Sequence, residues 1–223
     1  MTQSTPPGSP DRRYAVAPDD GDGRMSAPAA LRNRDEIAAA LAQIAPNSGR
    51  ALEIAAGTGE HVIRFAASMP GLNWQPSDPA DDRRASIKAW IAAEPASNID
   101  APIDLDACAP GWAAEHAPFD LVFFANLLHL IPVEQAETCL AEAAKATARG
   151  GILAIYGPFL RDGQTTSDGD AAFHARLSAD MPGAGYKDRD WVLAQLIQAG
   201  LIPEPPRDMA ANNLLLTARR AMS

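Results

Sequence analysis

The sequence is poor in cysteine, has no long apolar run and has no excess of basic residues. Cys108 and Cys139 are its only cysteines, and neither belongs to a CxxC pair or to a cluster with histidine. This pattern suggests neither a disulfide framework nor a zinc site, so we expect free thiols and no bound metal. No run of about 18 apolar residues could cross a membrane, and "MTQSTPPGSPDRR" lacks the apolar core of a secretory signal. We therefore expect a soluble, cytoplasmic protein with no membrane partner.

The charge balance argues against nucleic acid as a partner. The formal net charge is −9, whereas a protein that neutralises phosphates needs a basic surface. A chain of 223 residues with 47% hydrophobic residues can bury one good core. Residues 1–24 are rich in Pro, Gly, Ser and Asp, so we expect a disordered tail there and one domain over residues 25–223.

Apolar runs typical of strands alternate with runs of helical period along this domain. A leading helix is expected to be capped by Ser26 and to bury Ile37 and Leu41. The expected strands cover residues 50–56, 72–78, 101–107, 119–128 and 150–157, and the helices between them residues 60–69, 83–94 and 133–151. The last helix is expected to end at Gly150 or Gly151. This alternation predicts a parallel sheet covered by helices on both faces.

The pattern changes after residue 158. A polar stretch leads to a helix that is expected to start at Asp188 or Asp190 and to end at Gly200. Residues 201–208 and 212–220 then have strand character with no room for a helix between them, so they must form an antiparallel hairpin. The predicted fold class is α/β: a doubly wound, Rossmann-like, seven-stranded sheet with five parallel β/α units and a terminal antiparallel β-hairpin.

The run "LEIAAGTGEH", residues 52–61, ends a strand in a glycine turn before a helix. Such a turn leaves free backbone N–H groups at the helix start. A nicotinamide or flavin dinucleotide site would need a third small residue where the branched Val62 stands, and the GK[ST] ending of a nucleoside-triphosphate loop is missing. Acidic residues around the turn suit a ligand with positive charge. The turn is therefore a cofactor loop or an ordinary β-to-α packing turn.

Acidic residues end three successive expected strands. Glu53 ends the first strand, Asp78 the second and Asp106 the third, with Asp104 as a rival on the same face. In open α/β folds, the acid after the second strand accepts hydrogen bonds from ribose hydroxyls. Asp78 has an alternative reading as a turn residue before Pro79. Because the carboxyl ends of parallel strands meet at one edge of a sheet, we interpret the three acids as one binding edge.

The order of five β/α units and a terminal hairpin resembles the class I S-adenosylmethionine-dependent methyltransferases, which is a likeness of fold that needs support from a site. That family has an acid followed by a GxGxG-like turn, and here Ala55 stands in place of the first glycine. The resemblance implies S-adenosylmethionine as cofactor. The cofactor-binding residues that it implies are Arg32, Asn33, Glu53, Ala55, Gly57, Gly59, His61, Asp78, Asp106, Asn126 and Leu127.

The same resemblance assigns parts of the cofactor to these residues. Glu53 would help to hold the amino-acid part, Asp78 the ribose and Asp106 the adenine amino group. Asn126 and Leu127 would pass beneath the methionine and ribose portions. Residues 32–34 on the leading helix would cover the cofactor, or they form only a solvated helix face.

Seven ordered motifs make the resemblance more specific. They are "SAPAALRNR", "LEIAAGTGEH", "WQPSDP", "ASIKAWI", "ANLLH", "IYGPFLRDG" and "NNLLL". Together they resemble the uncharacterised methyltransferase family that includes methyltransferase-like protein 26, over about residues 26–220. Because that family is poor in established substrates, the resemblance implies the cofactor more firmly than any acceptor.

Four residues are candidates for the acceptor side. His129 and Tyr156 follow strands whose ends point to the shared edge, and we expect them to be catalytic if a base or an orienting group is needed. Arg161 and Asn213 are expected to bind the acceptor, and an anionic acceptor would suit Arg161. Packing roles for His129 and Tyr156, and a solvated loop position for Arg161, are the alternatives.

The sequence therefore predicts an enzyme that transfers a methyl group in line from S-adenosylmethionine to a small-molecule acceptor. One alternative is a non-catalytic S-adenosylmethionine-binding module that acts through a partner protein. A nicotinamide-dependent oxidoreductase is a third reading, which Val62 disfavours. The sequence leaves open the acceptor, the methylated atom and the oligomeric state.

Overall fold

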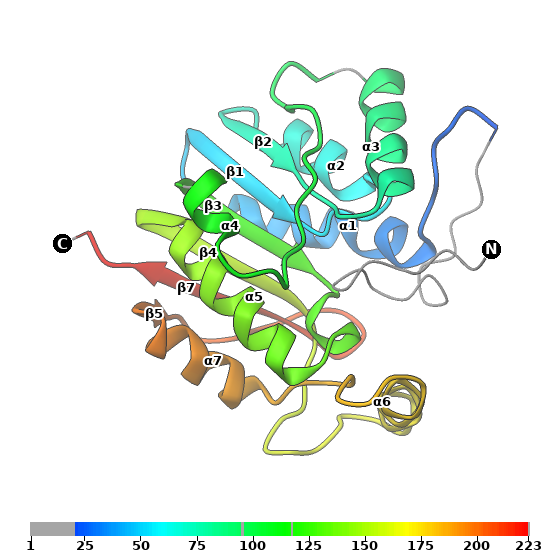
Figure 1. Ribbon diagram of the computed structural model, residues 1–223, viewed down its shortest axis with the longest axis vertical. Coiled ribbons are helices and arrows are strands. Elements are labelled where there is room, and N and C mark those ends of the chain that lie inside the picture. The colour runs from blue at the N-terminus through cyan, green and yellow to red at the C-terminus, as the bar shows by residue number, and fades with distance from the viewer. Residues whose placement is uncertain (1–20, 95, 117, 223) are drawn as a thin grey trace.

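The computed structural model describes residues 21–94, 96–116 and 118–222, and its centre is one seven-stranded sheet (Figure 1). The strand order is β2-β1-β3-β4-β7-β5, and β6 pairs with β7. The strands are β1 (Gly49–Ile54), β2 (Leu72–Pro76), β3 (Phe119–Ala125), β4 (Thr147–Pro158), β5 (Leu201–Pro203), β6 (Arg207–Asp208) and β7 (Asn213–Arg220). Neighbours from β2 to β4 are parallel, whereas β7 is antiparallel to β4 and to β5. The predicted α/β class with a terminal antiparallel hairpin is confirmed.

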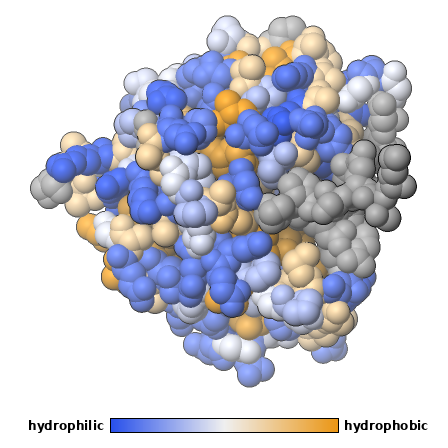
Figure 2. Space-filling model, viewed as in Figure 1, coloured by the Kyte–Doolittle hydropathy of each residue, from blue (hydrophilic) through white to orange (hydrophobic). Residues whose placement is uncertain are grey.

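Helices cover both faces of this sheet. The core on one face joins α1 (Pro28–Ala42), α2 (Glu60–Ser68) and α3 (Asp81–Ala93) to the strands. The core on the other face joins α4 (Trp112–His116), α5 (Val133–Ala146) and α7 (Arg189–Gln198) to them. The remaining helices are the short 3-10 helix η2 (Leu128–Leu130) and α6 (Asp168–Asp180), and Figure 1 shows α6 apart from the two helix layers. Hydrophilic side chains dominate the outer surface over α5 and α7 (Figure 2).

The central strand β3 explains why the two cores form. Its sequence FDLVFFA is almost continuously apolar, as expected for a strand that is buried on both faces. Because side chains alternate along a strand, Phe123 packs edge-on against Phe65 of α2 at 5.1 Å between ring centroids, and Phe124 enters the opposite core. Burial of each such ring contributes about 1.5–3 kcal/mol to folding. This rigid centre fixes the strand ends from which the candidate site is built.

Two predicted helix ends are wrong. Helix α1 has Ala27, not Ser26, at its N-cap; the Ala27 N–H donates to Glu60 Oε1 at 2.6 Å, and proline opens the first turn. Helix α5 ends at Ala146, before Gly150 and Gly151, because β4 starts directly at Thr147. A Cβ on Gly151 would lie 2.9 Å from Ala148 O and 3.0 Å from Asp120 O. That glycine therefore permits β3 and β4 to approach closely and does not close a helix.

The expected strand at residues 101–107 is also wrong as a regular strand. It pairs with the end of β2 through one isolated parallel bridge, Ser77 with Ile103. Asp78 N donates to Ile103 O at 3.2 Å, and Ile103 N donates to Pro76 O at 3.1 Å. Pro102 lacks an N–H and disfavours a continuous ladder. The sheet therefore has four regular parallel strands, and this segment runs along its edge beside β2.

The region after β4 contains one helix that was expected and one that was not. Helix α7 begins as predicted after Asp188, whose side chain accepts a hydrogen bond from Asp190 N at 2.8 Å. Helix α6 lies within the stretch that sequence patterning left without an element. Ser167 caps it, and Leu177 is its buried residue, so its apolar stripe is too narrow to signal a helix.

No helix in the described part of the chain is both long and apolar enough to cross a bilayer. Most of the predicted tail, residues 1–20, lies outside the described residues. Of the predicted tail, residues 21–24 are described, and Arg24 lies over the ring of Trp90 at 4.8 Å.

Candidate functional site

The turn after β1 combines an open glycine with a packed one. Ala55, Gly57 and Gly59 all have positive φ, at 51°, 61° and 107°. A Cβ on Gly59 would lie 3.0 Å from the Cα of Ile87 in α3, so Gly59 serves close packing. A Cβ on Gly57 would meet nothing within 4 Å. The packing interpretation of the turn therefore applies to Gly59, whereas the backbone at Gly57 faces space that a ligand can approach.

Ala55 adopts a left-handed conformation that costs an L-residue about 1–2 kcal/mol. This explains why glycine is the usual residue at the first position of such a turn. We expect Ala55→Gly to raise the free energy of unfolding by about 0.5–1 kcal/mol, measured by urea denaturation. The matched variant is Ala56→Gly, at a neighbour whose φ is not positive, and it should lower that free energy. Equal losses in both variants would contradict the strain at Ala55.

Glu53 is a buried carboxyl group with an oxygen that has no partner. It lies near the end of β1, is 1% exposed, and its Oε2 makes no hydrogen bond. Its Oε1 lies 3.7 Å from Nδ1 of His61, beyond hydrogen-bond distance. Burial raises the pKa of Glu53 well above its usual value, and the charges of Glu60 and Asp78 raise it further. A cationic ligand group next to Oε2 would relieve this cost.

Glu60, by contrast, is occupied within the protein. Its Oε1 accepts from the N–H of Ala27, and its Oε2 accepts from the hydroxyl of Thr58. Ser86 of α3 donates to Thr58 O at 2.7 Å and accepts from Met25 N at 2.8 Å. The segment before α1 and the glycine turn are thereby tied to α3. Of the two acids around the turn, Glu53 is the one with a free oxygen.

Asp78 ties the end of β2 to the glycine turn. Its Oδ2 accepts from Gly57 N and its Oδ1 accepts from Ala80 N, each at 3.0 Å. The residue is 2% exposed, and burial raises the pKa of its carboxyl group to about 6. Each oxygen retains a lone pair for a further donor. The structure thus brings Glu53, Gly57 and Asp78 together at the carboxyl edge of the sheet.

The two rival acids of the 101–107 segment differ in their surroundings. Asp104 is exposed and pairs with Nη1 of Arg84 at 3.2 Å. Asp106 is half-buried, and its Oδ1 accepts from Cys108 N at 2.8 Å. Burial raises the pKa of Asp106, as does the charge of Asp104. Its Oδ2 has no such internal bond among the described contacts, so Asp106 is the better placed of the two for a ligand.

A chain of polar contacts runs from Glu53 across two helices to β4. His61 Nε2 lies 2.8 Å from Asn33 Oδ1, and the Tyr156 hydroxyl lies beside the carboxamides of Asn33 and Asn213. Burial and the charge of Arg34 lower the pKa of His61 to about 4, so its ring is neutral at pH 7. Because a carboxamide oxygen only accepts, Nε2 of His61 carries the proton. Burial raises the pKa of Tyr156, which is therefore also neutral.

Three further predicted cofactor residues have contrasting positions. Asn126 follows β3 with a φ of 56°, and its N–H donates to Tyr156 O at 2.8 Å, so it marks a tight turn at the same edge. Leu127 is 2% exposed and belongs to the core on the α5 face. Arg32 is exposed on α1, whereas Asn33 is half-buried. The structure therefore brings Asn33 and Asn126 towards Tyr156 and leaves Arg32 on the outside.

His129 belongs to a separate cluster formed with α6. Its ring lies edge-on to Phe173 at 5.9 Å and to Tyr186 at 6.0 Å between centroids. Burial and the neighbouring charge of Lys187 lower the pKa of His129 to about 3. The ring is thus neutral and a weak base. Sequence patterning missed Phe173 and Tyr186, because only the folded α6 brings them to His129.

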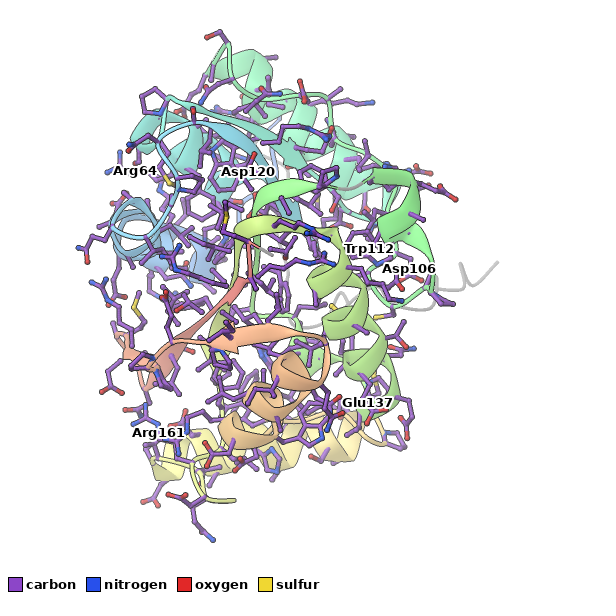
Figure 3. All side chains as sticks on the ribbon, turned by 90° about the vertical axis from the view of Figure 1, so that its left-hand side faces the viewer. Arg64, Asp106, Trp112, Asp120, Glu137 and Arg161 are labelled. Atoms are coloured by element: carbon purple, nitrogen blue, oxygen red, sulfur yellow. The ribbon has the colours of Figure 1, made fainter. Side chains whose placement is uncertain are left out.

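Arg161 lies at the end of the molecule that carries α6, far from Asp106 (Figure 3). Its Nη2 pairs with Asp208 at 3.2 Å, and it also donates to Asn212 O at 3.4 Å. Asn213 starts β7 opposite Pro158, and its side-chain Nδ2 donates to Ala210 O at 3.0 Å. Asn213 lies beside the Tyr156 hydroxyl, whereas the charge of Arg161 is already partly neutralised by Asp208.

A family model described as "Protein of unknown function (DUF938)" matches residues 24–220. Among solved structures, the chain is similar to an O-methyltransferase family protein from Burkholderia thailandensis, with a TM-score of 0.73 and 19% identity over 86% of this chain and 57% of that one. A putative O-methyltransferase from Nostoc punctiforme matches with a TM-score of 0.70 and 21% identity over 85% and 56%. Human N-acetylserotonin methyltransferase, solved with S-adenosylmethionine, matches with a TM-score of 0.69 and 15% identity over 86% of this chain and 53% of that one.

These structures share their fold with this chain. The chain spans little more than half the length of each of them. The sheet order and the antiparallel end strand are therefore those of a methyltransferase domain, whereas the reaction has to be argued from the site.

Proposed function

Because this chain belongs to the DUF938 family of proteins of unknown function, its activity must be derived from its site, and we propose that it is an S-adenosylmethionine-dependent methyltransferase with a small-molecule acceptor. The observation that carries the proposal is the unpartnered, buried oxygen of Glu53 beside the open glycine Gly57 and the carboxylate of Asp78. The methyltransferase fold of the chain supports it, as does the likeness of the chain to structures of O-methyltransferases and of a methyltransferase solved with S-adenosylmethionine.

The residues present fit this cofactor. Glu53 Oε2 needs a donor, which the ammonium of the amino-acid part offers. Asp78 retains acceptor capacity for ribose hydroxyls, and Gly57 has no side chain to exclude them. Asp106 would accept a hydrogen bond from the adenine amino group. Ala55, Asn126 and Leu127 would shape the part of the site between these acidic residues. We keep Arg32, Asn33 and His61 as cofactor-side residues on α1 and α2.

The cofactor supplies an activated methyl group on its sulfonium. The protein then has to bind the methyl donor and the acceptor, orient them and exclude water, because in-line positioning accounts for most of the rate. Asp78 and Glu53 would fix the donor end. Tyr156, held between Asn33 and Asn213, would orient an acceptor oxygen or nitrogen through its hydroxyl.

His129 would shape the acceptor pocket together with the aromatic rings of Phe173 and Tyr186. Because its ring is neutral and weakly basic, its proposed catalytic role is to orient the acceptor or to take a proton late in the transfer. Arg161 and Asn213 would contact the polar part of the acceptor. The likeness to the methyltransferase-like protein 26 family and a cytoplasmic location belong to the same proposal.

The proposed methyltransferase activity is tested by incubating the protein with a metabolite extract and S-adenosylmethionine that carries a label in its methyl group. We expect the label to appear in a small molecule, and Asp78→Ala to abolish most of that transfer. Label in protein or RNA would overturn the small-molecule acceptor. Tight binding of the cofactor without transfer to any acceptor would favour the non-catalytic binding module.

Gly57→Val is expected to weaken S-adenosylmethionine binding at least tenfold, or about 1.4 kcal/mol, in calorimetric titration. A Cβ at Gly57 would meet no protein atom within 4 Å, so the bulk of valine faces the ligand, and the strain of valine at positive φ is shared by the control variant below. Gly200→Val is the matched control, since Gly200 also has positive φ and open space but follows α7. Its affinity should equal that of the wild type. A folded Gly57→Val protein with unchanged affinity would mean that the glycine serves the turn alone.

Cofactor affinity should fall as the pH drops through about 6. The pKa of Asp78 is raised to about 6 by burial, and ribose hydroxyls bind its ionised form. The contribution of Asp78 to cofactor affinity is therefore fully present above this pKa and is lost below it. The raised pKa of Glu53 changes the affinity in the same direction. Calorimetric titrations with S-adenosylmethionine at pH values between about 5 and 7.5 measure this change in affinity. Asp78→Asn should bind more weakly, with a flatter profile, and an equally steep profile in this variant would assign the dependence elsewhere.

A further inference from the structure

Two side chains on one face of α6 hold Tyr186. Helix α6 stands apart from the two helix layers (Figure 1), and Leu177 is its buried residue. Asp170 and His174 lie one helical turn apart on the same face. Asp170 Oδ1 accepts from the Tyr186 hydroxyl at 3.2 Å, and Nδ1 of His174 accepts from the Tyr186 N–H at 2.9 Å. Helix α6 therefore binds Tyr186 through both its side chain and its backbone.

The glycine before Tyr186 lets the chain approach the His174 ring. Gly185 has a φ of 118°, and a Cβ there would lie 2.9 Å from Nδ1 and Cε1 of His174. The N–H of Gly185 donates to His129 O at 2.9 Å. The Tyr186 ring lies 5.6 Å from the His174 ring and 6.0 Å from the His129 ring, between centroids. Gly185 and Tyr186 thus connect His174 to His129, which the proposed function places in the acceptor pocket.

The hydrogen bond between His174 and Tyr186 specifies a protonation state. A backbone N–H only donates, so Nδ1 of His174 has to keep its lone pair, and the proton of the neutral ring is on Nε2. Protonation would place a second donor at Nδ1, opposite the Tyr186 N–H, and would break the bond. The docked position of α6 therefore binds one proton fewer than a released position. By linkage, docking weakens as the pH falls through the range in which histidines gain their charge.

The charged groups near this contact come from α6 and from the segment that follows it: Asp170, Arg176 and Lys187. The carboxylate favours a positive charge on His174, and the two cations oppose it. Burial lowers the pKa of Lys187 to about 8, so its amine is charged below that pH. Burial and the charge of Lys187 lower the pKa of His129 to about 3, and that ring stays neutral. The pH dependence of docking is therefore assigned to His174 and not to His129.

We propose that His174 is a positioning residue of the acceptor side, which in its neutral form holds Tyr186 against Phe173 and His129. The inference rests on the proposed function and deepens it, because it makes the acceptor side sensitive to pH independently of the carboxyl groups proposed for the cofactor. At low pH α6 is released, the three rings separate and the acceptor binds more weakly. The alternative is a structural role, in which the His174 ring only fills the space beside Gly185.

The first test measures hydrogen exchange of α6 by mass spectrometry, as protection factors corrected for the intrinsic exchange rate. In the wild type we expect protection over residues 168–180 to fall about tenfold between about pH 7.5 and pH 5, while protection of α5 stays constant. His174→Asn keeps an acceptor oxygen near the place of Nδ1 and does not titrate, so α6 should stay protected at both pH values. His174→Phe keeps a ring without an acceptor and should lower protection at both.

His116→Asn is the matched control, because His116 lies on α4, and it should behave as the wild type. The second test uses the acceptor identified by methyl labelling. At pH 7.5 the KM for this acceptor should rise about tenfold in His174→Phe and stay unchanged in His174→Asn, with the affinity for S-adenosylmethionine unchanged in both. Rescue by asparagine distinguishes a hydrogen-bond acceptor from a ring that fills space.

Wild-type protection that does not change with pH, or a change that persists in His174→Asn, would overturn the inference. Equal losses of protection in His174→Asn and His174→Phe would overturn it as well. If His174→Phe does not fold, as judged by thermal melting, the comparison of the wild type with His174→Asn decides. The exchange measurement needs neither cofactor nor acceptor. Absence of methyl transfer would therefore reject the proposed function, and the protection factors would still decide whether His174 docks α6.

Discussion

Replacing Asp78 by alanine is expected to weaken binding of S-adenosylmethionine by about 10- to 150-fold, because a carboxylate that accepts from ribose hydroxyls contributes about 1.5–3 kcal/mol. Calorimetric titration above pH 7 measures this loss with the wild-type carboxylate ionised. The same substitution removes the acceptors of Gly57 N and Ala80 N. The melting temperature should therefore fall too, and both quantities have to be measured on the same protein.

Asp104→Ala supplies the matched control for Asp78→Ala. Asp104 is an exposed carboxylate at the same end of the sheet, paired with Arg84. Its removal should leave the affinity within about twofold of the wild type, since an exposed ion pair contributes little. If Asp78→Ala lowers only the melting temperature and leaves the affinity intact, Asp78 is the turn residue of the alternative interpretation.

Tyr156→Phe is expected to lower kcat about 100-fold while the affinity for S-adenosylmethionine stays nearly unchanged. The hydroxyl that it removes lies between the carboxamides of Asn33 and Asn213, on the acceptor side of the edge. A group that acts on the transition state without touching the donor changes kcat and leaves donor binding alone. The rate is measured with saturating donor and the acceptor identified by methyl labelling.

His129→Ala is tested in the same assay and should also lower kcat about 100-fold if its ring orients the acceptor. The ring packs against Phe173 and Tyr186, so the melting temperature is measured as well. Rates close to wild type in both variants would show that neither residue orients or deprotonates the acceptor. Catalysis would then rest on proximity or on another group.

The sequence predicted the part of the site that follows from sheet geometry. Glu53 and Asp78 come together because the ends of neighbouring parallel strands share one edge, and a strand shows its end in the sequence by an apolar run that stops at an acid. The open backbone at Gly57 follows from the same turn. These features depend on local sequence and on one general rule of topology.

The rest depends on contacts between distant segments. Asn33 gains its role only when α1 packs over α2 and places it against His61. Helix α6 has a single buried residue, and it is held by Asp170, which accepts from Tyr186 and from Asn212. The alternation of "IDLD" in residues 101–107 indicates a strand, yet Pro102 leaves it with one bridge to the end of β2. Of these outcomes, only the broken strand at residues 101–107 has a local signal in the sequence, which is Pro102.

Sequence patterns also could not predict which buried polar atoms lack a hydrogen-bond partner. The sequence grouped Arg34 with Arg32 and Asn33 on α1, and it treated the acidic residues around the glycine turn, Glu53 and Glu60, alike. The fold separates each pair, since Glu60 is bonded to Ala27 and Thr58 whereas Glu53 and Arg34 each keep a buried atom without a partner. Unsatisfied atoms appear only when every neighbour is known, and for this reason they carry the functional argument.

The most direct test of the central claim is a calorimetric titration of the purified protein with S-adenosylmethionine and, separately, with NADH. The account predicts saturable binding of one S-adenosylmethionine per chain and no heat of binding with NADH, because Glu53 offers a site for a cation and Val62 stands where a dinucleotide fold needs a small residue. Saturable binding of NADH together with no binding of S-adenosylmethionine would contradict it.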